Sequence, residues 1–173
     1  MSNFFLANLE SPAQSRIMFS PLTFYVAGHP AGQPRTKASR RGGFIRIYTP
    51  LTVKNKAGES KKHPCVTWKE QIAGAWLAAA PGWVKVQVPV MLTLCFNMPR
   101  PKSHFNSKGL KPMAPPFYSS KPDIDNLAKA VMDALTMCGA WEDDNQVVIL
   151  KVTKQYVQDG ESGCSINIRH AAL

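Results

Sequence analysis

The strongest constraint on the fold is a strict alternation of apolar side chains between positions 86 and 96. Every second position there is apolar: Val86, Val88, Val90, Leu92, Leu94 and Phe96. A period of two is typical of a strand with one buried face, although Pro89 favours an edge strand or a bulge. The chain therefore contains a sheet with an apolar side, and other elements have to cover that side.

Two segments with helical periodicity can cover this sheet. The first begins after Pro64 and stops at Pro81-Gly82, and its tryptophans are expected in the core rather than as a base-stacking platform. The second is expected over about Ile124 to Met137, where apolar residues recur at i, i+3, i+4, i+7, i+8 and i+11 from Leu127 onward. Gly139 follows at the position of a helix C-terminal cap.

Four more segments are expected as strands, over residues 22–27, 44–48, 145–156 and 164–169. The predicted order is roughly β-β-α-β-α-β-β. This order indicates the α+β class, with a mixed β-sheet and two main helices packed on it. We expect an N-terminal arm over residues 1–20 and a single domain over 21–173, which suits a chain of 173 residues.

The charge of the chain is divided unevenly. The net charge is +10, which favours a polyanionic partner such as nucleic acid. Residues 1–121 hold 17 Lys or Arg and three acids, whereas residues 122–173 hold four bases and eight acids. Six of those acids lie between Asp123 and Asp144. A basic body with a compact acidic cluster is the asymmetry that a function must explain.

Two basic segments are candidates for contact with DNA. The turn-rich stretch 34–43 supplies Arg35, Lys37, Arg40 and Arg41, and it could be a phosphate-contacting loop of a hairpin between the strands 22–27 and 44–48 or a solvated loop. The proline-rich loop 98–121 has no acids, carries interleaved aromatic residues and ends at Lys121. It suits a flap that faces nucleic acid and equally a flexible linker.

The four cysteines have no zinc-ligand spacing, so reduced thiols in the core are expected. No secretory signal is visible, and no apolar run is long enough to span a bilayer. A cytoplasmic protein without a membrane partner is therefore expected.

The acidic cluster is the candidate site. Asp125, Lys129 and Asp133 follow one another at i, i+4 on the second helix, Asp123 stands at its entrance, and Asp144 comes soon after it. Carboxylates suit Mg²⁺, which assists hydrolysis of phosphodiester bonds by activating water and offsetting charge. The alternatives are structural: Asp123 as a helix cap, Asp125 as a charge on the helix dipole, and ordinary surface ion pairs.

The candidate residues belong to a longer stretch, about Lys121 to Val147, with these runs: Lys121-Pro122-Asp123-Ile124-Asp125-Asn126-Leu127-Ala128-Lys129, Val131-Met132-Asp133-Ala134-Leu135 and Trp141-Glu142-Asp143-Asp144-Asn145-Gln146-Val147. This stretch resembles the RusA family of Holliday junction resolvases. This resemblance implies a RusA-like fold and a homodimer of bacterial or phage-infected cells. It also implies that the homodimer makes paired nicks in four-way or branched DNA during recombination and repair.

By position, the resemblance makes Asp123, Asp125 and Asp144 ligands of Mg²⁺, with Mn²⁺ as a substitute, and Lys129 the catalytic lysine at the scissile phosphate. Asp143 is an alternative or a helper. Two other functions stay open: a non-catalytic, structure-selective nucleic-acid-binding protein, and a metal-dependent nuclease that acts on flaps or forks.

Overall fold

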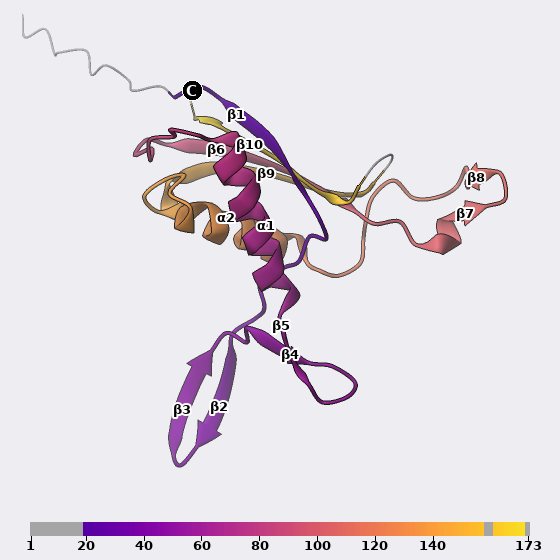
Figure 1. Cartoon of the computed structure of the whole chain (residues 1–173), viewed down its shortest axis with the longest axis horizontal. Coiled ribbons are helices and arrows are strands. Elements are labelled where there is room, and N and C mark those ends of the chain that lie inside the picture. Colours follow the sequence, from indigo (N-terminus) through magenta and orange to yellow (C-terminus); the bar gives the residue numbers. More distant parts are fainter. Residues whose placement is uncertain (1–18, 158–160, 172–173) are drawn as a thin grey trace, which may run out of the picture.

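A four-stranded mixed sheet organises the chain in the computed structural model, which describes residues 19–157 and 161–171. Most of the expected N-terminal arm, residues 1–18, lies outside the described residues. The strands stand in the order β1-β10-β6-β9 (Figure 1). Their bounds are β1 Leu22–Ala27, β6 Val90–Met98, β9 Val147–Tyr156 and β10 Gly163–His170.

The sheet is mixed, as the element pattern predicts. Strand β10 pairs antiparallel with both β1 and β6, whereas β6 and β9 run parallel. Between β6 and β9 the chain passes through the helix α2 (Ile124–Met137), because parallel neighbours need a long crossover connection. The site-bearing helix is therefore part of this crossover.

Two long helices of the described residues cover one face of the sheet. Helix α1 (Pro64–Ala79) begins with proline in its first turn, and the His63 side chain accepts a hydrogen bond from the Cys65 N–H group. Helix α1 contacts β1, helix α2 contacts β9, and the helices contact each other. The predicted bounds of α2 and the predicted class are confirmed.

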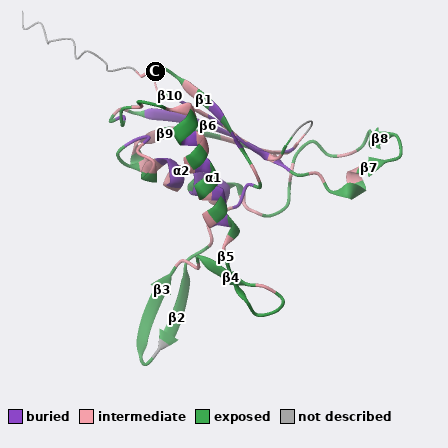
Figure 2. Cartoon of the chain, in the orientation of Figure 1, coloured by how far each residue is buried: buried purple, intermediate pink, exposed green. Residues whose placement is uncertain are grey.

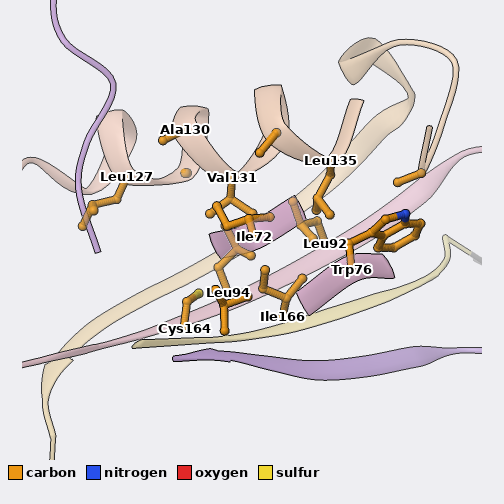
Figure 3. Packing of buried hydrophobic residues seen from close by; sticks show 14 of the residues in the cluster. Ile72, Trp76, Leu92, Leu94, Leu127, Ala130, Val131, Leu135, Cys164 and Ile166 are labelled. Atoms are coloured by element: carbon orange, nitrogen blue, oxygen red, sulfur yellow. The ribbon is translucent and has the colours of Figure 1, made fainter. Parts of the chain in front are cut away.

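The core lies between these helices and the sheet, where the apolar stripe of α2 faces side chains from α1, β6 and β10 (Figure 3). Trp68 and Trp76 are buried, which confirms the core interpretation of the tryptophans. All four cysteines are free, with Cys65 and Cys164 buried. Burial raises the pKa of each thiol, most strongly for Cys164, so the thiols stay protonated near neutral pH.

Two predicted strand boundaries need correction. Strand β6 begins only at Val90, because Pro89 lacks the N–H group that a ladder needs; Val86 forms an isolated bridge to Trp141. Before β9, residues Asp144–Gln146 form the short 3-10 helix η2. The polar stretch at the beginning of the expected strand 145–156 thus forms a turn that leads into the strand.

The expected hairpin between residues 22–27 and 44–48 is wrong in its pairing. Strand β1 pairs with β10 because its apolar side chains belong to the core. Strand β3 (Phe44–Tyr48) instead pairs with β2 (Lys37–Arg41), which lies inside the expected basic loop. A second small hairpin joins β4 (Thr52–Lys54) to β5 (Ser60–Lys62), so the element order has more strands than expected.

Both small hairpins lie at the N-terminal end of α1 and project away from the sheet (Figure 1). Their described strands are exposed (Figure 2). The loop 98–121 forms another projection, with η1 (Lys102–His104), β7 (Phe105–Asn106) and β8 (Gly109–Leu110). Its base is fixed to the sheet, because Tyr156 N–H donates to the Pro116 carbonyl and Tyr118 N–H donates to the Lys154 carbonyl. No helix among the described residues has the length and apolar character needed to cross a membrane.

Candidate functional site

The first turn of α2 presents two carboxylates. Asp123 occupies the N-cap position and Asp125 the first turn, where the helix dipole favours negative charge. The Asp123 side chain makes no capping hydrogen bond; its Oδ2 instead accepts one from Arg35 Nη2 at 3.3 Å. Among the described residues, the Asp125 carboxylate has no hydrogen-bond or ion-pair partner. Neither carboxylate is therefore committed to holding the helix end.

Close packing of the preceding segment brings Arg35 to this turn. The Gln33 N–H group donates to the Asn126 carbonyl at 2.8 Å. A Cβ atom on Gly32 would lie 3.1 Å from Asn126 Cβ and 3.2 Å from Pro122 Cβ, so a larger residue would force the segments apart. Residues 32–35 thus lie directly on the entrance of α2.

The side chains of Lys154, on β9, and of the nearby Tyr118 hold the residues just before Asp123. Lys154 Nζ donates to the carbonyls of Ser120 at 2.7 Å and Pro122 at 2.8 Å, and the Tyr118 hydroxyl donates to the Lys121 carbonyl. Sequence reasoning missed Lys154, since no local pattern links it to residues more than 30 positions away. These bonds fix the backbone from which Asp123 extends.

Lys129 lies one turn after Asp125, and its ammonium group is held near Asp133. Asp133 Oδ2 accepts from Lys69 of α1 at 2.9 Å, while Lys129 Nζ lies 3.5 Å from Asp133 Oδ1. Lys69 and Asp133 are both largely shielded from solvent, whereas Lys129 is more than half exposed. Lys69 therefore offsets the charge of Asp133, and the Lys129 ammonium group stays more than half exposed.

A second acidic group, Glu142 to Asp144, lies between α2 and β9, and its two aspartates have different roles. Asp143 caps η2, because its carboxylate accepts from Asn145 N–H while the Gln146 side chain bonds back to the Asp143 N–H group. Asp144 is partly exposed, and within the described part of the chain its carboxylate has no partner. Helix η2 contacts α2. Of this adjacent pair, Asp144 is the residue with a free carboxylate.

A shallow pocket of about 550 Å³ lies beside Asp123. Arg35, His63 and Lys121 line it together with Asp123 and Asn126. His63 Nδ1 accepts from the Cys65 N–H group at 3.1 Å, which leaves its Nε2 as a proton donor. The pocket thus combines cationic and neutral donors with one carboxylate at its edge, an arrangement suited to a phosphate group next to a cation.

The fit of a divalent cation depends on the two carboxylates of α2. Within residues 19–157 and 161–171, no three acidic, histidine or cysteine side chains form a group that could hold one metal ion. Mg²⁺, however, is commonly bound by one or two carboxylates, with waters and substrate phosphates completing its shell. Asp123 and Asp125 fit such a site, while Asp144 is not grouped with them.

Two of the predicted DNA-contacting residues, Arg35 and Lys121, line the pocket beside Asp123, and the others belong to the strand that follows Arg35. Lys37 and Arg40 are exposed on β2, Arg35 precedes that strand, and Lys121 lies at the pocket. The Arg41 side chain lies outside what the structure describes. The basic hairpin therefore begins at the candidate site rather than at a remote surface.

Comparison with known proteins agrees with this arrangement. The family model described as endodeoxyribonuclease RusA matches residues 27–169. An uncharacterized protein, YqaN, of Bacillus subtilis strain 168 is 32% identical over 141 residues, which is 80% of this chain and 89% of that protein.

Two shorter matches carry a functional name. The crossover junction endodeoxyribonucleases RusA of Escherichia coli K12 and of Enterobacteria phage 82 are each 55% identical over 38 residues, 22% of this chain. Those matches span 32% of each named protein, so only part of it is compared. Taken with the family match, they place the chain in the class of endodeoxyribonucleases. The chain belongs to the RusA family.

Proposed function

We propose that this protein is a magnesium-dependent endonuclease that resolves Holliday junctions and other branched DNA by paired nicking, with Mn²⁺ able to replace Mg²⁺. The main support is the pair of carboxylates at the first turn of α2, next to the root of a basic hairpin: Asp125 has no partner among the described residues, and Asp123 has only the exposed Arg35. Neither performs the capping role that would explain it structurally. The resolvase names of the partial relatives support branched DNA as the substrate.

In this proposal Asp123 and Asp125 would hold the cation, and Asp144 would join them only by a rearrangement on binding, because the described residues do not group it with the other two. A bound divalent cation supplies Lewis-acid chemistry, lowering the pKa of water and offsetting charge on the phosphate oxygens. A cation at Asp123 would compete with Arg35, and the exposed Arg35–Asp123 pair is worth little by itself, so Arg35 would be free to contact a DNA phosphate. Lys154 keeps Asp123 in place through the carbonyls before it.

Lys129 contacts the scissile phosphate. Lys129 follows Asp125 by four residues, so both side chains project from one face of α2, and the Lys129 ammonium group is more than half exposed. A cation placed there stabilises the negative charge that develops on the phosphate during cleavage. Asp133 acts on Lys129 by restricting where that ammonium group lies, and Lys69 prevents Asp133 from neutralising it fully.

Paired nicks need two active sites, so a homodimer is part of the proposal. Strand β9 is an edge of the sheet; residues 116–118 pair with its last residues, while Val148 and Leu150 in its first half are 58% and 43% exposed. Unpaired edge strands with apolar side chains favour association with another chain. The cellular role proposed is DNA recombination and repair in the cytoplasm of a bacterial or phage-infected cell.

The test uses a labelled synthetic four-way junction with and without Mg²⁺. We expect symmetrical nicks in opposing strands with Mg²⁺ or Mn²⁺, none with EDTA, and little cleavage of a linear duplex of the same sequence. Cleavage of flaps or forks in preference to junctions would show that the substrate is one of these structures rather than the four-way junction. No metal-dependent cleavage of any of these substrates by folded protein would overturn the proposal.

The competing function is a non-catalytic, structure-selective binder whose acids are structural. Replacement of a true capping aspartate destabilises a protein by roughly 0.5–2 kcal/mol. Because the Asp123 carboxylate makes no capping bond, we expect Asp123→Asn to leave the melting temperature unchanged or slightly raised. A fall of several degrees in differential scanning calorimetry would favour the structural role.

Arg35 provides a test of the exchange between cation and guanidinium. Arg35→Gln should tighten Mn²⁺ binding a few-fold in isothermal titration calorimetry without DNA, because the competing positive charge at Asp123 is gone. The same variant should bind DNA more weakly, with a salt dependence reduced by about one phosphate contact. Lys37→Gln is the matched control: it should weaken DNA binding and leave Mn²⁺ affinity unchanged. Equal Mn²⁺ affinity in the Arg35→Gln variant would contradict the exchange.

A further inference from the structure

The β2–β3 hairpin exposes large apolar side chains that its own chain leaves uncovered. Phe44, Ile45 and Ile47 are 79%, 71% and 74% exposed, and the hairpin stands clear of the sheet and helices (Figures 1 and 2). A two-stranded hairpin gains little stability in water by itself, and contiguous exposed apolar surface marks interaction sites. The hairpin therefore has the features of a surface that binds another molecule.

The register of the hairpin mixes apolar and basic side chains on both faces. Lys37 stands opposite Tyr48, and Ser39 stands opposite Arg46, on one face; Arg40 stands opposite Ile45 on the other. Residues 37–48 contain four bases and no acid, and residues 35–62 contain nine bases and one acid. A second copy would bring the same positive charge, which opposes pairing of two such hairpins, whereas a polyanion complements it.

The tip of the hairpin is tight, and it is close to the candidate site. Gly42 and Gly43 adopt φ values of +60° and +84°, as a two-residue turn between twisted strands requires, and Phe44 follows directly. The root is Arg35, whose guanidinium contacts Asp123. Six residues of extended chain separate Arg35 from the turn, a reach of roughly 20 Å. Phe44 can therefore contact the same DNA molecule that Asp123 faces.

We propose that Phe44 inserts between bases at the branch point of the DNA, while Lys37, Arg40 and Arg46 contact the phosphates on either side. Apolar wedges carried by basic elements unstack base steps in this way, and the energetic cost is lowest where stacking is already interrupted. The hairpin thereby distinguishes a branch from continuous duplex. This inference rests on the proposed function, since it names how that site selects its substrate.

The test measures unstacking without cleavage. A four-way junction carries 2-aminopurine beside the branch point, and binding is followed in EDTA. Wild-type protein should raise the 2-aminopurine fluorescence, and Phe44→Ala should abolish the rise and weaken junction binding about 10-fold, with duplex binding changed less than about twofold. Phe44→Leu should restore part of the rise. Val84→Ala, at a position 82% exposed outside the hairpin, should behave as wild type.

The outcomes separate the inference from the proposed function. Selective junction binding with no fluorescence rise, or an equal rise in Phe44→Ala, overturns the wedge and leaves the endonuclease proposal standing. Loss of a dimer in Phe44→Ala by analytical ultracentrifugation also overturns it, because the apolar tip would then cover a second copy. Binding with no preference for junction over duplex also overturns the wedge, whereas the endonuclease proposal fails only if the folded protein shows no metal-dependent cleavage.

Discussion

Asp125→Asn is expected to lower the rate of junction nicking by about three orders of magnitude and to leave junction binding equal or tighter. The Asp125 carboxylate is exposed and has no partner among the described residues, so its loss removes a metal ligand without disturbing packing. Loss of one preorganised electrostatic group lowers the rate of catalysis about 10²- to 10³-fold. For removal of a direct metal ligand we expect a fall near the top of that range. Binding improves because a negative charge leaves the DNA face.

Asp143→Asn is the matched control for this change in charge. Asparagine is as good a capping residue as aspartate, so η2 keeps its cap and the protein keeps its activity. The measurement is the single-turnover nicking rate of a labelled junction, with affinity measured separately in Ca²⁺ or EDTA. Wild-type cleavage by Asp125→Asn, or equal inactivity of Asp143→Asn, would contradict the assigned roles.

Leu135→Ala is expected to destabilise the fold by about 3–5 kcal/mol. Leu135 is fully buried on α2 and faces Trp76 and Leu92 across the core (Figure 3). Such truncations remove buried apolar surface and leave a cavity. Because α2 carries Asp125 and Lys129, the variant should lose nicking activity at temperatures well below those that inactivate the wild type.

Leu77→Ala makes the same chemical change on the outer side of α1, where Leu77 is 73% exposed. Its effect should stay within about 0.5 kcal/mol. Urea denaturation followed by circular dichroism compares the two variants. Similar midpoints for both would show that α2 is not packed as described.

The elements that sequence reasoning located well are those whose side chains enter the core. The bounds of α2 and β1 match the expectation, because apolar spacing and the terminating Gly139 and Gly28 are local signals. Strand β2 lies in a segment that the sequence predicts as a loop, because neither face of the strand is buried and no apolar alternation marks it. Its Gly42-Gly43 turn was the available signal.

In the candidate site, too, the local features can be predicted from the sequence and the long-range contacts cannot. The spacing of Asp125 and Lys129 can be recognised from sequence, since residues four apart share a helix face, and Asp123 is recognisable as the residue at the helix entrance. The contact of Arg35 with Asp123 joins residues 88 positions apart. Lys154, on strand β9, donates to the Pro122 carbonyl from 32 positions away. Such contacts arise from tertiary packing and have no sequence pattern of their own.

A crystal structure of the protein grown with Mn²⁺ tests the metal site most directly, through the anomalous signal of the ion. We expect one peak at the first turn of α2, with oxygens of Asp123 and Asp125 about 2 Å away and the Arg35 guanidinium displaced. A contact to Asp144 would complete the proposed ligand set. No peak at saturating Mn²⁺, or a peak remote from Asp123 and Asp125, would contradict metal-dependent cleavage at this helix.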